Sequence, residues 1–273
     1  MKPIFIIVIV FLSQFSFAQD DLRLKIYREN EGKSYFIYAD NEEFAPISLE
    51  FSYTATNMNS SLSNKSVIII PANSKKFLIT ELNSIDTKKG TSFKYDVFYV
   101  FGDVNTKNSE NSFAYSLPFA KNKKYLVYQG YNGNFSHQNA NSIDFSLQTG
   151  NEVYAARDGK VVQVVTQNNQ NCNTKDCAKF NNKILILHND GTFAEYVHLK
   201  QNGSVVKIGD EISQGQLIGY SGNTGWSKGP HLHFSVFTNK IDGGRNYIKT
   251  KFKINGTPNP VYLEEKKWYS RSL

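Results

Sequence analysis

The sequence has 273 residues, of which 40% are hydrophobic, 14% are aromatic and 20% are charged, and its formal net charge at pH 7 is +7. This hydrophobic content excludes wholesale disorder, and the length suggests one or two domains. The basic residues are scattered and no nucleic-acid-binding motif accompanies them, so nucleic acid is not an expected partner. The sixteen tyrosines and twenty phenylalanines favour a mostly β fold, because aromatic side chains fit half-buried pleated sheets.

Residues 1–18 have the pattern of a secretory signal peptide. Lys2 gives a positive start, residues 4–12 are an unbroken apolar run, and Ser16 and Ala18 supply small residues for cleavage after Ala18. A membrane anchor is the alternative, but a spanning helix needs about 20 apolar residues. The sequence therefore predicts an exported protein, periplasmic or secreted, without a transmembrane anchor.

Residues 19–105 are predicted to form an accessory domain of short strands. Strands are expected at 22–27, 34–38, 47–53, 65–70, 76–79 and 92–101, with polar turns between them. This spacing is typical of an immunoglobulin-like β-sandwich. Because the segment contains neither histidine nor cysteine, we interpret it as a structural or docking module.

A polar linker is predicted at residues 106–115, followed by a second domain at 116–273. Within this domain we expect strands at 161–166, 183–188, 193–199, 216–220 and 232–237, punctuated by many glycines. No long helix is predicted.

The two cysteines, Cys172 and Cys177, lie in a polar segment of the second domain. Export favours a disulfide, and closing so short a loop would stabilise the fold by about 2 kcal/mol. Metal binding is the alternative, but two cysteines without a nearby cysteine or histidine partner make a poor zinc site. The sequence therefore predicts a disulfide.

All five histidines lie between residues 137 and 233. His231 and His233 alternate with Leu232 and Phe234, so on a strand the two histidines would project to the same side. Two polar residues on the wet face of a strand would produce the same pattern. The motif therefore gains weight only from its context.

That context is a third histidine, His198, at the end of an alternating strand, together with His137 and Asp144 further upstream. Imidazole and carboxylate groups are suitable zinc ligands, and a catalytic zinc needs three protein ligands and one open position. Other histidines beside the metal could move the proton of a zinc-activated water and polarise a carbonyl. The constellation predicts a hydrolytic zinc site.

These motifs, taken in order, resemble those of the M23 metallopeptidases, the family of lysostaphin and the LytM-like peptidoglycan endopeptidases. The resemblance runs from about Gln129 to Phe237. Its ordered blocks are Asp144-Phe145 and residues 150–162, 184–192, 196–199, 218–225 and 229–234.

The resemblance implies an antiparallel β LytM-like catalytic domain that hydrolyses peptide cross-links of peptidoglycan through a zinc-activated water. It implies that the ligands of the Zn2+ ion are His137, Asp144 and His233. It also implies that His198 and His231 are the catalytic pair. One departure is the interval of seven residues between His137 and Asp144, where the family commonly has four.

The resemblance leaves the role of one further residue open and assigns no metal-ligand role to another. Tyr131 matches a tyrosine that some family members use near the scissile carbonyl, and it also fits an ordinary aromatic residue of a β-turn. His188 stands where the family often has a histidine without a ligand role, so we interpret it as structural.

Other functions are compatible with the same pattern. A non-catalytic LytM-like module that binds and activates a cell-wall hydrolase is the main alternative, and a peptidase of proteins or glycine-rich peptides is another. The first usually lacks metal-site residues, whereas this sequence has the full set. Neither a His-Glu-x-x-His helix nor a Gly-x-Ser-x-Gly elbow occurs in the sequence.

Overall fold

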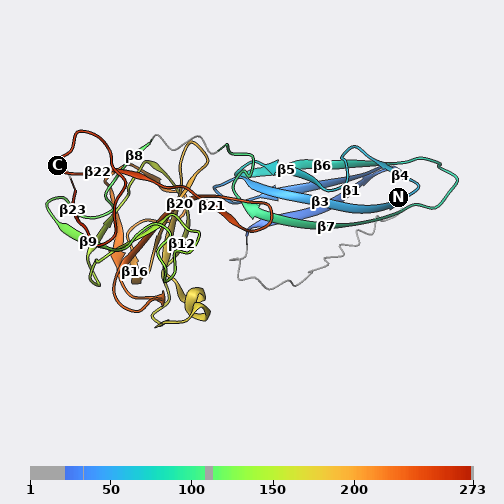
Figure 1. The fold of residues 1–273 in the computed structure, drawn as a ribbon. Coiled ribbons are helices and arrows are strands. Elements are labelled where there is room, and N and C mark those ends of the chain that lie inside the picture. Colours follow the sequence, from blue (N-terminus) through green and yellow to red (C-terminus); the bar gives the residue numbers. More distant parts are fainter. Residues whose placement is uncertain (1–21, 33, 108–112, 272–273) are drawn as a thin grey trace.

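The computed structural model describes residues 22–32, 34–107 and 113–271. The predicted signal peptide and part of the predicted linker lie outside the described residues. Within them, strands dominate and the helical element is a 3₁₀ helix at Lys175–Phe180, so the expectation of a mostly β fold is confirmed (Figure 1). None of the helical structure in these ranges is long and apolar enough to cross a membrane.

The N-terminal part is a β-sandwich, as predicted, and forms the elongated right-hand part of Figure 1. Inward-pointing side chains of both sheets share a core that includes Ile37, Phe51, Ile70 and Leu82. One sheet has the order β1 (Leu24–Glu31), β2 (Ser34–Asn41), β6 (Ser74–Ser84), β4 (Met58–Ser60), and the other β5 (Ser66–Ile70), β3 (Ile47–Thr56), β7 (Ser92–Phe101).

The C-terminal part is built on a large antiparallel sheet. Its order is β17 (Glu211–Ile212), β12 (Gly159–Val165), β14 (Lys183–Leu187), β15 (Phe193–Val197), β20 (Leu232–Asn239), β10 (Ser142–Phe145), β9 (Lys124–Gln129), β23 (Trp268–Ser270), with β21 (Arg245–Tyr247) also paired to β20. A smaller sheet has the order β11 (Glu152–Tyr154), β18 (Leu217–Ser221), β16 (Leu199–Ser204). Two short parallel pairs join β13 (Asn171–Cys172) to β19 (Gly225–Trp226) and β8 (Ala114–Ser116) to β22 (Lys251–Lys253).

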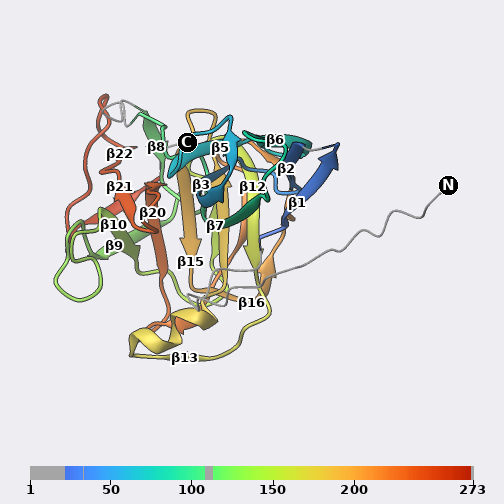
Figure 2. The ribbon, with the colours of Figure 1, turned by 90° about the vertical axis from the view of Figure 1, so that its right-hand side faces the viewer.

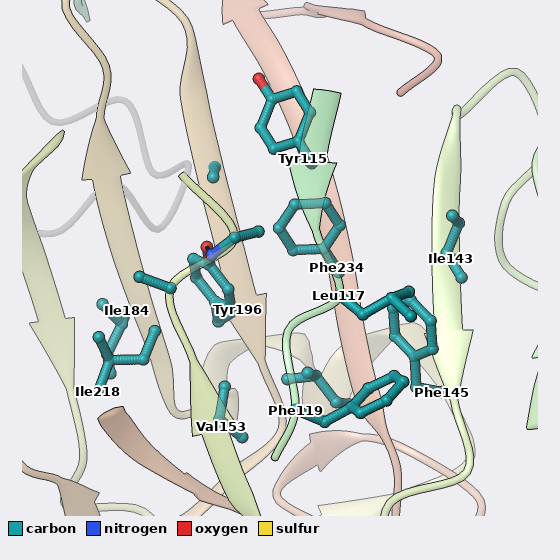
Figure 3. Packing of buried hydrophobic residues seen from close by; sticks show 14 of the residues in the cluster. Tyr115, Leu117, Phe119, Ile143, Phe145, Val153, Ile184, Tyr196, Ile218 and Phe234 are labelled. Carbon is teal, nitrogen blue, oxygen red and sulfur yellow. Dashed lines mark hydrogen bonds between the residues drawn. The ribbon is translucent and has the colours of Figure 1, made fainter. Parts of the chain in front are cut away.

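One face of the large sheet carries the main core (Figure 3). Tyr196 and Phe234 from the large sheet pack in the same cluster as Val153 and Ile218 from the smaller sheet. Tyr115 of β8 is fully buried in this cluster, so β8 begins inside the segment predicted as a linker.

The opposite face of the large sheet contacts the sandwich, because side chains alternate along each strand. Phe44 and Phe101 of the N-terminal part pack against an apolar cluster that includes Phe193 and Phe237. Gly102 approaches so closely, with φ of +92°, that a Cβ atom there would lie 2.5 Å from the Phe193 ring. The sandwich is therefore attached to the large sheet through a packed apolar contact, and Figure 2 shows it in front of that sheet.

Candidate metal centre

Of the two histidines of the His-x-His motif, His233 lies in β20, and His231 immediately precedes this strand and forms an isolated bridge with Gly222. Leu232 and Phe234 are buried in the main core, whereas His233 points to the opposite face, as the alternation predicted. Asp144 of β10 is directly opposite His233 in the antiparallel register. This pairing brings together a carboxylate and an imidazole from residues that are 89 positions apart in the sequence.

His137, Asp144 and His233 converge on one point. The Asp144 Oδ1 atom is 2.9 Å from His233 Nδ1 and 3.2 Å from His137 Nε2. The two imidazole nitrogens are 3.2 Å apart. Zinc–ligand bonds of about 2.1 Å in a tetrahedron place ligand atoms about 3.4 Å from one another, so this spacing suits a small divalent ion.

The protonation of these groups also favours a cation between them. His137 Nδ1–H donates to the Gly130 carbonyl oxygen at 2.9 Å, which leaves a lone pair on Nε2 aimed at the Asp144 carboxylate. Burial opposes ionisation of Asp144, but its contacts with His137 and His233 outweigh burial and hold its pKa well below the usual range. Burial would also lower the pKa of His137, and Asp144 instead raises it. A lone pair and a carboxylate at this distance repel unless a proton or a metal ion lies between them, so the residues fit a metal ion.

His198 and His231 lie next to this cluster, with ring centroids 4.4 Å apart. His198 Nδ1–H donates to the Thr224 carbonyl oxygen at 2.7 Å, and His231 Nδ1–H donates to the Gly229 carbonyl oxygen at 2.8 Å. Each ring thus keeps a lone pair on Nε2, and His231 Nε2 lies 3.8 Å from Asp144 Oδ1. Such neutral imidazoles can accept a proton during a reaction.

The environment keeps both rings neutral. Burial is the main reason that the pKa of His198 is lowered to about 3, and electrostatic interactions with His231 and His233 add to this effect. Burial also lowers the pKa of His231. His198 has a positive φ of 65°, which is uncommon for a non-glycine residue and frequent at functional sites.

A pocket of about 360 Å³ opens onto these side chains and is lined by Asp144, His198, His231 and His233 among others. His233 is the most open of the metal-binding candidates, with 20% of its side chain exposed, against 1% for His137. The pocket therefore gives a substrate access to one side of the cluster.

A tyrosine lines the pocket, and it differs from Tyr131, whose role the sequence left open. The Tyr131 hydroxyl donates to the Thr250 carbonyl oxygen at 2.6 Å, and Tyr131 is absent from the residues that line the pocket within the described ranges. Tyr128 lines it instead, with its ring edge-on to His231 at 5.4 Å. Burial and then the Asp144 carboxylate raise the pKa of Tyr128, so its hydroxyl keeps its proton at neutral pH.

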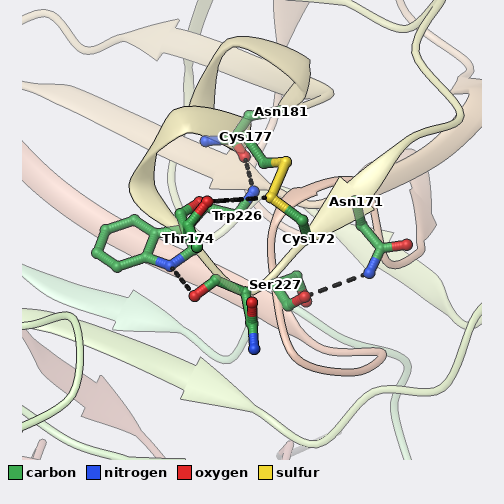
Figure 4. The surroundings of a disulfide bond; sticks show 8 residues. Asn171, Cys172, Thr174, Cys177, Asn181, Trp226 and Ser227 are labelled. Carbon is green, nitrogen blue, oxygen red and sulfur yellow. Dashed lines mark hydrogen bonds between the residues drawn. A yellow bond between two sulfur atoms is a disulfide. The ribbon is translucent and has the colours of Figure 1, made fainter.

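The disulfide between Cys172 and Cys177 (Figure 4) closes a loop next to residues that line the same pocket. The 3₁₀ helix that includes Cys177 also carries Lys179, which lines the pocket. The other side of the loop is fixed by Trp226, whose backbone N–H donates to Asn181 Oδ1 at 3.0 Å and whose indole N–H donates to the Asn173 carbonyl oxygen at 3.2 Å. Sequence analysis predicted this bond but not its place beside the site.

His188 lies away from the cluster and is buried. Its Nδ1–H donates to the Asp158 carbonyl oxygen at 2.6 Å, and its ring is edge-on to Tyr115. Neither contact involves a metal-binding candidate, which agrees with a structural role.

Comparisons with known proteins match a region that includes Asp144 and His233 and begins one residue after His137. Residues 138–243 match the family model of peptidase family M23. Glycyl-glycine endopeptidase ALE-1 of Staphylococcus capitis is 36% identical over 120 residues, which are 44% of this chain and 30% of that protein. Peptidoglycan DD-endopeptidase ShyA of Vibrio cholerae is 38% identical over 96 residues, which are 35% of this chain and 20% of that protein.

Among solved structures, the catalytic domain of lysostaphin from Staphylococcus simulans is 30% identical, with 46% of this chain and 87% of that chain covered and a TM-score of 0.34. The matching segments span between 20% and 38% of the length of the curated relatives named here and of an uncharacterized metalloprotease of Buchnera aphidicola.

Proposed function

We propose, from the membership of residues 138–243 in peptidase family M23, that this chain is an exported zinc metalloendopeptidase that hydrolyses peptide cross-links of peptidoglycan. The observation that carries the proposal is the convergence of His137, Asp144 and His233 at the end of a pocket that also exposes two neutral histidines. The printed names of two relatives, a glycyl-glycine endopeptidase and a peptidoglycan DD-endopeptidase, support a cell-wall peptide as the substrate.

In this proposal the residues that would hold the metal are His137, Asp144 and His233. A zinc ion bound there would act as a Lewis acid and lower the pKa of a coordinated water toward 7. Gly130 fixes the His137 ring through its carbonyl oxygen, as outer-shell partners of metal-binding histidines usually do.

His198 and His231 serve as the catalytic pair. Their Nδ1–H groups are committed to backbone carbonyl oxygens, so each Nε2 atom is available to take a proton from the nucleophile or to give one to the leaving amine. Their lowered pKa values keep both rings neutral at neutral pH, so each Nε2 atom carries a lone pair. A non-catalytic module would have no need for this arrangement, which favours an enzyme.

The sandwich formed by residues 19–105 is proposed to act as an accessory domain beside a catalytic domain at 116–273. Phe193 contacts the sandwich, whereas Val197, four residues along the same strand, lines the pocket. Because a strand rises about 3.3 Å per residue, the sandwich edge lies roughly 13 Å from the pocket along this strand. The sandwich can therefore flank a bound cross-linked polymer without contributing a catalytic side chain.

Digestion of purified peptidoglycan, with products identified by mass, tests the proposal. The protein lacking residues 1–18 is expected to cleave the peptide cross-links, so that separate stem peptides appear among the products. A chelator is expected to stop this cleavage. His231→Ala, which leaves the metal-binding candidates in place, serves as the matched control and should be nearly inactive. Undiminished release by His231→Ala, or release that persists in chelator, would contradict the assignment.

A further inference from the structure

The pocket beside the metal cluster has an excess of cationic side chains. Lys179, Lys183, Lys228 and Arg245 line it, whereas the acidic residues in its lining are Asp144 and Glu195. Asp144 belongs to the metal cluster, so its charge is already shared with His137 and His233. The net charge of the other residues that line the pocket is therefore positive.

Glu195 neutralises only part of this charge. Its carboxylate accepts a hydrogen bond from Arg245 Nη1 at 2.7 Å. Burial opposes ionisation of Glu195, but Arg245 and Lys183 outweigh it and hold its pKa at about 2. Glu195 is therefore an ion-pair partner within the pocket wall and is not available to counter further cations.

Lys179 and Lys228 make no ion pair with an acidic residue in the described parts of the chain. Each ammonium group instead lies over an aromatic ring, Lys228 at 3.6 Å from the Phe135 centroid and Lys179 at 5.1 Å from the Phe180 centroid. Both residues are exposed, and both line the pocket. They are positioned to meet an anionic ligand that enters it.

The two lysines are held by structure around the site. Lys179 follows the disulfide-bonded Cys177 in the 3₁₀ helix, and Lys228 is three residues before His231. The Ser227 hydroxyl, next to Lys228, donates to Asn223 Oδ1 at 2.7 Å and fixes this loop. Lys179 is thus held in the disulfide-bonded loop, and Lys228 in the loop that leads into β20 and His233.

We propose that this pocket selects cross-linked peptides that carry free carboxylates beside the scissile amide over neutral bridges such as a run of glycines. The inference rests on the proposed function and specifies its substrate class. A neutral glycine bridge offers only backbone dipoles to Lys179 and Lys228. A free carboxylate offers a negative charge with which the ammonium groups can form ion pairs. A pocket of about 360 Å³ is large enough for the residues on one side of the cleaved bond.

The test uses a synthetic cross-linked peptide with free carboxylates and an otherwise identical peptide in which they are amidated. Binding of each to the zinc-loaded His231→Ala variant is measured by calorimetry, so that turnover does not enter. At low salt we expect the carboxylate form to bind about three- to tenfold more tightly, the range for two exposed ion pairs. The preference should fall as the salt concentration rises.

The double variant K179Q/K228Q, made in the same background, is expected to remove most of this preference. Lys207→Gln removes an exposed positive charge outside the pocket lining and should keep the preference. Equal affinity for the two peptides, or an unchanged preference in K179Q/K228Q, would overturn the inference. Selective binding without cleavage by the zinc-loaded natural sequence would instead contradict the proposed function and leave the pocket assignment standing.

Discussion

Replacing His188 should remove a large part of the acid sensitivity of the fold. His188 is 2% exposed, its Nδ1–H donates to the Asp158 carbonyl oxygen, and its buried Nε2 atom has no hydrogen-bond partner among the described residues. A proton added at Nε2 would create an unpartnered buried charge. Burial is the main reason that the pKa of His188 is lowered to about 4.

The magnitude follows from the difference between the folded and unfolded pKa values. An unfolded histidine takes up its proton near pH 6.5, whereas folded His188 does so only near pH 4. Protonation therefore favours the unfolded chain as the pH falls from about 6.5 toward 4. Linkage gives a loss of about 2 kcal/mol in the free energy of unfolding between pH 7 and pH 5 from this residue alone.

Urea denaturation at pH 7 and pH 5 measures the effect. The natural sequence and His188→Gln are compared in chelator, so that loss of metal at acid pH does not contribute. Gln retains an N–H donor for the Asp158 carbonyl oxygen but cannot be protonated. We expect the variant to be less stable at pH 7, and its free energy of unfolding to fall by about 2 kcal/mol less than that of the natural sequence on acidification. Because the other histidines are common to both proteins, their titration cancels in the difference. Equal losses in the two proteins would refute the reasoning.

Three other predictions concern the site. His233→Ala should lose the bound zinc, whereas His231→Ala should keep it and lose about 10²–10⁴-fold in kcat. Elemental analysis measures the metal content, and loss of zinc from both variants would show that His231 is a ligand and not only a catalytic residue. Tyr128→Phe should lower kcat on a soluble cross-linked peptide by about tenfold, on the order of one lost hydrogen bond to a charged group, while Tyr131→Phe should not; the reverse ranking would return the role to Tyr131. Reduction of the disulfide should loosen the loop beside the pocket and raise KM severalfold at unchanged zinc content. An unchanged KM would show that other contacts keep the loop in place without the disulfide.

Residue patterns were sufficient to predict several strands, including the one that carries His233. The alternation of His231 and His233 with Leu232 and Phe234 correctly indicated a strand with one face in the core. The strands around residues 34–38, 47–53 and 92–101 were also found, because each alternates strongly. Short strands such as β10 and β11 were missed, since three or four residues carry too little periodicity.

The positions that depend on loop shape could not be predicted. Tyr128 and Tyr131 are three residues apart, and which of them reaches the pocket depends on where β9 ends and how the following loop turns. That loop is closed by a hydrogen bond from Asn132 N–H to the Ala140 carbonyl oxygen at 2.9 Å, which allows His137 and Asp144 to meet despite their wide spacing. Such contacts are set by non-local pairing of strands, which the sequence does not display.

Stoichiometric restoration of activity by zinc tests the central claim most directly. Metal-free protein lacking residues 1–18 is titrated with zinc while the release of peptides from purified peptidoglycan is measured. The three-ligand cluster of His137, Asp144 and His233 predicts that activity rises linearly and saturates at about one zinc per chain. Full cleavage by the metal-free protein, or binding of one zinc per chain without any cleavage, would contradict it.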